Sequence, residues 1–190
     1  MTTGRLEAFS DAVIAILITI LVLELEVPHE PELAALGDLV PVFSSYVLSF
    51  VYLGIYWNNH HHMMVLTERV NGRILWANLH LLFWLSLVPF TTAWMGQNDF
   101  AGVPTAVYGV DLLLAAVAYF ILQRSIIVEE GANSTLAAAL GRDLKGKISP
   151  VLYVIGVSLS FAVPLAGLAI YVLVALLWLV PDRRIESSIA

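Results

Sequence analysis

The chain has 190 residues, of which 59% are hydrophobic and 13% charged, and its mean hydropathy is +0.86. Soluble domains are about 45–50% apolar, so this composition predicts an integral membrane protein. The absence of cysteine excludes disulfides, thiolate metal ligands and cysteine nucleophiles, and the net charge of -6 argues against a nucleic-acid partner.

The first apolar segment, residues 8–27, has the length of a membrane-spanning helix. It lacks the basic region and cleavage site of a signal peptide, so we expect it to be retained. On a helix with about 100° per residue, one face carries a stripe that lies opposite Ser10 and Asp11. The stripe consists of Arg5, Phe9, Ala12, Ile16, Thr19, Ile20, Leu23 and Val27. On the pattern alone, such a branched aliphatic stripe is most often a helix-packing surface.

Apolar segments follow at residues 39–58, 74–94, 104–123, 149–163 and 165–180. Together with the first, they predict an all-α integral membrane protein with about six transmembrane helices per chain, in a single domain of residues 1–190. The last two segments are short and meet near Pro164 and Gly167. This junction fits either a tight hairpin or a single bent segment.

The distribution of charge favours six crossings. With six, one side of the membrane carries all nine basic residues, namely Arg5, Arg69, Arg73, Arg124, Arg142, Lys145, Lys147, Arg183 and Arg184. The opposite loops carry only acidic charges, at Glu30, Glu32, Asp38 and Asp99, with Glu24 and Glu26 at the end of the first span. By the positive-inside rule, both termini are then cytoplasmic in a multi-pass protein of the cell membrane.

Polar side chains from the first three spans share one depth. Four of them lie six to nine residues from an arginine at the cytoplasmic end, which is roughly 10 Å at 1.5 Å per helical residue. We therefore expect a hydrogen-bonded cluster drawn from Ser10, Asp11, Trp57, His60, His61, Asn78 and His80. In it, the first span meets one of the two histidines of the second span and either the asparagine or the histidine of the third. The tryptophan donates its indole N–H. A structural role and a role in proton relay or ion binding both remain open.

Two local patterns resemble a metal site and a potassium filter, but neither is expected to act as one. Three successive histidines, His60 to His62, point about 100° apart on a helix and cannot converge on one ion, so we expect no metal site. Tyr108-Gly109 echoes a potassium filter but lies inside a predicted helix, where its carbonyls are already hydrogen-bonded. No catalytic motif is present, so we expect that the chain is not an enzyme.

A second intramembrane carboxylate, Asp111, lies in the outer half of the fourth span. A charged group at this depth is costly and needs a partner. Tyr46, Ser44 and Ser86 are candidates at similar depth, and the sequence does not choose among them.

Four short motifs together carry a family resemblance. They are Arg5-x-x-x-Phe9-Ser10-Asp11, Tyr56-Trp57-x-x-His60-His61, Asn78-Leu79 and Pro89-Phe90. In this combination the chain resembles the transmembrane protein 175 family, the potassium-permeable channels of lysosomes and bacteria. It has the form of a single-repeat member of the bacterial type.

The resemblance implies a homotetramer in which the first helices line a central pore. Ile16 occupies the position of the family's narrow hydrophobic constriction. Thr19 and Leu23 fit further pore-facing layers, and Ile20 lies on the same stripe. The resemblance implies no cofactor besides the permeant potassium ions.

Three functions remain open: a channel, a proton-coupled transporter that uses Asp11 and the histidines, and a membrane interaction protein. The absence of a repeated half argues against the transporter, and the clustered intramembrane charge argues against the interaction protein. We therefore predict a potassium-permeable cation channel in the lipid bilayer. A pore without carbonyl cages is expected to prefer potassium only modestly. Glu24 and Glu26 near the outer mouth would raise the local cation concentration.

Overall fold

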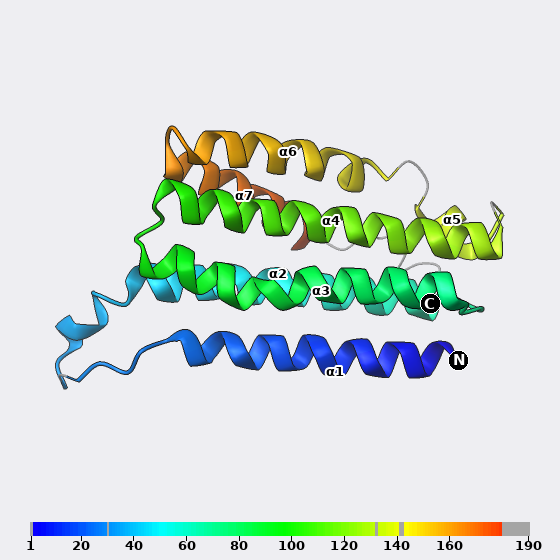
Figure 1. The fold of residues 1–190 in the computed structure, drawn as a ribbon, viewed down its shortest axis with the longest axis horizontal. Helices are drawn as coiled ribbons and strands as arrows, with labels where there is room; N and C mark the ends of the chain where they lie inside the picture. The colour runs from blue at the N-terminus through cyan, green and yellow to red at the C-terminus, as the bar shows by residue number, and fades with distance from the viewer. Residues whose placement is uncertain (1, 30, 132, 141–142, 180–190) are drawn as a thin grey trace.

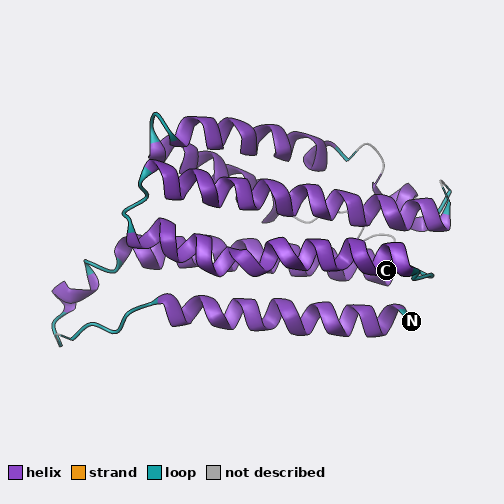
Figure 2. Cartoon of the chain, viewed as in Figure 1, coloured by secondary structure: helices purple, strands orange, loops and turns teal. Residues whose placement is uncertain are grey.

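The computed structural model describes residues 2–29, 31–131, 133–140 and 143–179 and is helical, with no strand in these ranges. Its long helices run side by side and alternate in direction (Figure 1), and loops are confined to the two ends of the bundle (Figure 2). The helices are α1 (Thr3–Leu21), α2 (Val40–Val65), α3 (Gly72–Gln97), α4 (Gly102–Glu130), α5 (Thr135–Leu140), α6 (Leu144–Ser160) and α7 (Pro164–Leu179). Short 3-10 turns, η1 (Val22–Glu24) and η2 (Leu33–Leu36), lie between α1 and α2.

Local sequence signals set several helix ends. The Asn71 side chain accepts a hydrogen bond from the backbone N–H of Ile74 at 3.0 Å and so caps the start of α3. Gly131 follows the end of α4 with a φ of 98°, a left-handed conformation that glycine adopts at little cost. Pro164 is the first residue of α7, where its missing N–H is not needed.

Four helices are long and apolar enough to cross a membrane: Thr3–Glu24, Val40–Val65, Gly72–Gln97 and Gly102–Glu130. The apolar helix α7 has 16 residues and α6 has 17, so both fall below the length of the other four. The prediction of an all-helical membrane protein is therefore confirmed. The count of six crossings stays a prediction.

The junction near Pro164 is a hairpin and not a single bent segment. The helix α6 ends at Ser160, α7 begins at Pro164, and the two helices run antiparallel in Figure 1. Their close approach depends on Gly167, since a Cβ built there would lie 2.7 Å from the backbone oxygen of Gly156 and would also overlap the Ser160 hydroxyl. Only a residue without a side chain fits this contact.

We expect Gly167→Ala to lower the thermal midpoint of unfolding in detergent. A backbone oxygen cannot move aside as a flexible side chain can, so α6 and α7 must separate, at a cost of about 1–3 kcal/mol. The matched control is Gly54→Ala in α2, because no atom lies within 4 Å of a Cβ built at Gly54. That exchange should be neutral or slightly stabilising. Equal melting of the two variants would contradict the close approach.

The two ends of the bundle differ in charge. The described basic residues gather at the end that holds the N-terminus, which we call the basic end: Arg5, Arg69, Arg73, Arg124, Lys145 and Lys147. The opposite, acidic end carries Glu24, Glu26, Glu32, Asp38 and Asp99 and no Lys or Arg among its described residues. Arg142, Arg183, Arg184 and Glu30 belong to the same prediction but lie outside the described residues. The charge segregation that underlies the six-span prediction is thus present in the fold.

The helix α1 is peripheral in the single chain. It packs mainly against α2 and α3, whereas α3 and α4 are the most buried of the long helices. The helix pair α6 and α7 lies on the other side of the bundle, against α4 and α2. One side of α1 is therefore free of contacts within the chain.

Candidate functional site

The two faces of α1 have different surroundings. The buried face consists of side chains spaced three or four residues apart, which is one stripe of a helix: Leu6, Ser10, Ile14, Leu17 and Leu21. These side chains pack against α2 and α3. The sequence placed Ser10 away from the aliphatic stripe, and it lies on this buried face.

The predicted aliphatic stripe lies on the other face, which the chain does not cover. Ile16 is 57% exposed and Leu23 77%, and Thr19 is exposed between them, while Ile20 is half-buried. The Thr19 hydroxyl donates to the Ile16 carbonyl oxygen at 2.8 Å, so its oxygen lone pairs remain available to another donor or to a cation. The family-motif residues Arg5 and Phe9 are also exposed.

A chain of buried hydrogen bonds ties α1 to α2 and α3; we call Ser10, Asn78 and His60 the polar anchor. The Asn78 side-chain amide donates to the Ser10 hydroxyl at 2.9 Å, and the Ser10 hydroxyl donates to the Leu6 carbonyl at 2.9 Å. His60 Nε2 lies 2.8 Å from Asn78 Oδ1. Because this oxygen can only accept, Nε2 carries the proton. His60 Nδ1 is then an acceptor, and it has no hydrogen-bond partner in the described part of the chain.

Two further contacts join α1 to α2, one on each side of the polar anchor along the helix axes. The Trp57 indole N–H donates to Asp11 Oδ1 at 3.1 Å, and His61 Nδ1 lies 2.7 Å from Glu7 Oε1. Glu7 and Asp11 are four residues apart, so both carboxylates face α2. Glu7 is not among the residues predicted from the sequence, although its spacing of four residues from Asp11 places both carboxylates on one face of the helix.

Other candidate residues lie apart from these contacts. His80 accepts a hydrogen bond from Trp84, one turn further along α3, at 2.9 Å and does not join the polar anchor. His60 and His61 contact different partners, Asn78 and Glu7. Neighbouring histidines on one helix are thus directed at separate groups, as the helical geometry requires.

The candidate partners suggested for Asp111 are wrong. Thr91 of α3 donates to Asp111 Oδ2 at 3.1 Å, whereas the exposed Ser86 donates to its own helix, to the Phe83 carbonyl. The partner does lie at a similar depth, because Thr91 and Asp111 are at similar distances from the turn that joins α3 to α4. The helix face decides the pairing, and Thr91 faces α4.

Comparisons with known proteins agree with this arrangement. The sequence profile described as endosomal/lysosomal potassium channel TMEM175 matches residues 5–89, which include nearly all of α1 and the polar anchor. A potassium channel of Chryseobacterium sp. strain P1-3 is 54% identical over 189 residues, which is 100% of this chain and 98% of the relative. A potassium channel of Chamaesiphon minutus is 32% identical over 174 residues, 84% of each chain.

A solved structure also matches the fold. The crystal structure of a lysosomal potassium-selective channel TMEM175 homologue from Chamaesiphon minutus aligns with a TM-score of 0.84 and 28% sequence identity. The alignment covers 95% of this chain and 97% of that one. Both sequence and fold are therefore shared over nearly the whole length, and the chain belongs to the TMEM175 family of potassium channels.

Proposed function

We propose that four copies of this chain form a potassium-permeable channel whose central pore is lined by the exposed face of α1. The observation that carries the proposal is the division of α1 into two faces. One face is fixed to α2 and α3 by apolar packing and the polar anchor, and the other presents Ile16, Thr19 and Leu23 to whatever surrounds the chain. Family membership favours a pore over lipid as that environment.

In this assembly Ile16 forms the constriction. A ring of branched aliphatic side chains removes the hydration shell of an entering ion and offers no ligand in return, so the ring can empty of water and close. Thr19, Ile20 and Leu23 form the next layers toward the acidic end. Selection among cations then depends on the pore width and on the Thr19 hydroxyls. We therefore expect a modest preference for potassium over sodium.

The charge of the two ends fits cation passage through the cell membrane. Glu24 and Glu26 at the acidic end attract cations to the pore mouth from within roughly 10 Å at ordinary salt. With the basic end cytoplasmic, both termini are inside the cell. The channel needs no resident cofactor, and potassium is its permeant ion.

The polar anchor serves to position α1. Its three side chains are fully buried and mostly satisfied by one another, which supports a structural role. Proton-coupled transport by Asp11 and the histidines would need these groups to exchange protons with both sides. His60 is fully buried against Asn78 of α3, which favours the channel.

The test is ion flux from purified protein in liposomes. We expect an outward potassium gradient to drive flux that exceeds the flux with sodium, in assemblies of four chains by native mass spectrometry. A metal chelator should leave the flux unchanged. Lack of potassium flux, or flux tied to a fixed number of protons, would contradict the proposal.

A further inference from the structure

Asp111 of α4 is a buried carboxyl group that the proposed pore does not use. Its side chain is 4% exposed within the single chain, so it is buried by the subunit itself, whatever surrounds the bundle. Its Oδ2 atom lies against the Thr91 hydroxyl of α3, and its Oδ1 atom has no hydrogen-bond partner among the described residues. An ionised carboxylate in such a place needs a cation or several hydrogen-bond donors.

No positive charge balances Asp111. It forms no ion pair within the part of the chain that the structure describes. Arg124 of the same helix is thirteen residues away, which is about 20 Å along the axis. The helices packed against α4 are α3, α6 and α7. Their described Lys, Arg and His residues all lie toward the basic end, whereas Asp111 lies in the other half of the bundle: Arg73, His80, Lys145 and Lys147.

The titratable side chains that do surround Asp111 are tyrosines. Tyr108 of α4 and Tyr56 of α2 lie within electrostatic reach of its carboxyl group. Behind Tyr108, the ring of Tyr171 from α7 contacts that of Tyr153 from α6. Tyrosine hydroxyls are neutral near pH 7, so none of them offsets the charge of a carboxylate.

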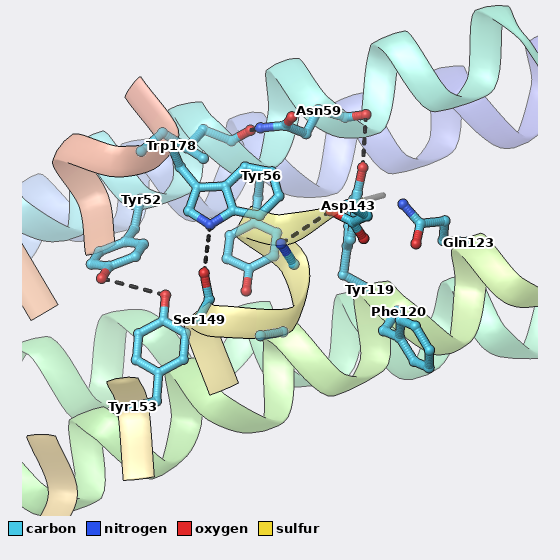
Figure 3. A pocket seen from close by; sticks show the side chains of 13 residues that line it. Tyr52, Tyr56, Asn59, Tyr119, Phe120, Gln123, Asp143, Ser149, Tyr153 and Trp178 are labelled. Carbon is cyan, nitrogen blue, oxygen red and sulfur yellow. Dashed lines mark hydrogen bonds between the residues drawn. The ribbon is translucent and has the colours of Figure 1, made fainter. Parts of the chain in front are cut away.

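Water in the subunit's internal cavity does not reach Asp111 either. This cavity of about 50 Å³ lies between α2, α4, α6 and α7, and Figure 3 shows Tyr56 and Tyr153 in its wall. At 10–15 Å³ for each molecule, it has room for roughly three to five waters. Asp111 is not among the residues that line it. A buried carboxylate with neither a cation nor water beside it takes up a proton rather than remain charged.

The contact with Thr91 also fits a neutral carboxyl group better than an ionised one. The single hydroxyl proton of Thr91 faces three acceptors, at 3.1 Å from Asp111 Oδ2, 3.2 Å from the Val88 carbonyl and 3.3 Å from the Leu87 carbonyl. A hydroxyl that donates to a carboxylate usually lies about 2.5–2.7 Å from it. With a proton on Oδ2, Asp111 donates to Thr91 and Thr91 donates to a backbone carbonyl, so the competition disappears.

We propose that Asp111 is a proton-binding site, at which the folded subunit holds the carboxyl group in its neutral form at neutral pH. The bound proton fastens α4 to α3 through Thr91. Loss of the proton leaves a lone charge between the two helices, which no neighbour offsets. Because α3 also carries Asn78 of the polar anchor, the scaffold behind α1 becomes less stable in alkaline solution, although no titrating group of the pore is involved.

The test is the infrared spectrum of the purified full-length protein at neutral pH, in a detergent without ester groups. A protonated carboxyl group has a C=O stretch that is well separated from the carboxylate bands, and exposed carboxyl groups are ionised at this pH. We expect the band in the parent and in Asp99→Asn, and its loss in Asp111→Asn. Asp99 is an exposed control whose φ of 49° asparagine tolerates. A parent without the band, or an Asp111→Asn variant that keeps it, would overturn the proposal.

Thr91→Val assigns the band while the carboxyl group stays in place. Valine has nearly the shape of threonine but cannot accept the proton of Asp111, so the C=O stretch should move to higher frequency. The matched control is Thr105→Val, because the Thr105 hydroxyl is buried and has no hydrogen-bond partner in the described part of the chain. A band that stays in place in Thr91→Val, or moves equally in both variants, would show that another group carries the proton.

The pH dependence of the thermal midpoint gives a second readout. A carboxyl group that is neutral in the folded state and ionised in the unfolded state makes the folded state bind more protons. The free energy of unfolding must then fall as the pH rises from about 5 to about 8. Asp111→Asn cannot ionise at this position, so we expect its midpoint to fall less than that of the parent over the same range. Equal slopes in the two proteins would contradict the proposal, and neither measurement depends on conduction.

Discussion

Replacement of Ile16 by asparagine is expected to raise the basal potassium flux at least tenfold and to weaken the preference for potassium over sodium. In the proposed ring of four Ile16 side chains, the asparagine amide would hold water and offer oxygen ligands to a passing ion. Each fall of about 1.4 kcal/mol in the barrier raises the rate tenfold. The measurement is flux in liposomes at matched amounts of assembled protein.

Leu17→Asn is the control for this prediction. Leu17 is the next residue, but it is 6% exposed and packs toward α2 and α3. Its replacement buries an amide without a partner, so we expect less assembled protein and no leak in what remains. If Ile16→Asn conducts like the parent while Leu17→Asn leaks, the pore face has been assigned to the wrong side of α1.

The second large effect is expected at Asn78, the middle of the polar anchor. Asn78→Leu keeps the approximate volume but removes the acceptor for His60 and the donor for Ser10. Each buried group left without a partner costs roughly 1–3 kcal/mol. We expect a lower thermal midpoint and a lower tetramer yield, with an unchanged ratio of potassium to sodium flux in the protein that assembles.

Asp11→Asn separates the role of the polar anchor from that of the contact between Asp11 and Trp57. Asparagine keeps the oxygen that accepts from Trp57 at a half-buried position, so the loss of stability should be smaller than for Asn78→Leu. A normal thermal midpoint in Asn78→Leu together with altered ion preference would show that the anchor belongs to the conduction path.

The sequence predicts the long helices well but not all of their ends. Mean hydropathy marks the part of a helix that can lie in lipid, so α2 was predicted to end near residue 58 and α4 near residue 123. The structure extends them to Val65 and Glu130. Backbone hydrogen bonding continues past the apolar core wherever no residue breaks the helix, and hydropathy does not detect this. The charge distribution already favoured the hairpin of α6 and α7, but the close contact of the two helices at Gly167 is seen only in the structure.

The sequence predicts how deep each polar residue of the site lies along its helix, but it does not predict how the helix is rotated about its axis. The rise per residue places Ser10, His60 and Asn78 in one layer, whatever the packing. The choice of Asn78 over His80, and of Thr91 over Ser86 for Asp111, depends on how each helix is turned about its axis. That rotation is set by contacts with neighbouring helices, which one sequence does not reveal.

The two faces of α1 also bear on how such a channel can change over evolutionary time. Residues that hold α1 in its subunit and residues proposed to meet the ion occupy different sides of the same helix. Exchanges at Ile16, Thr19 or Leu23 therefore leave the subunit's interior untouched. Distant and independent sites contribute nearly additively to stability. Substitutions on the exposed face of α1 can thus change the ion preference one residue at a time, while the buried face keeps its packing against the rest of the subunit.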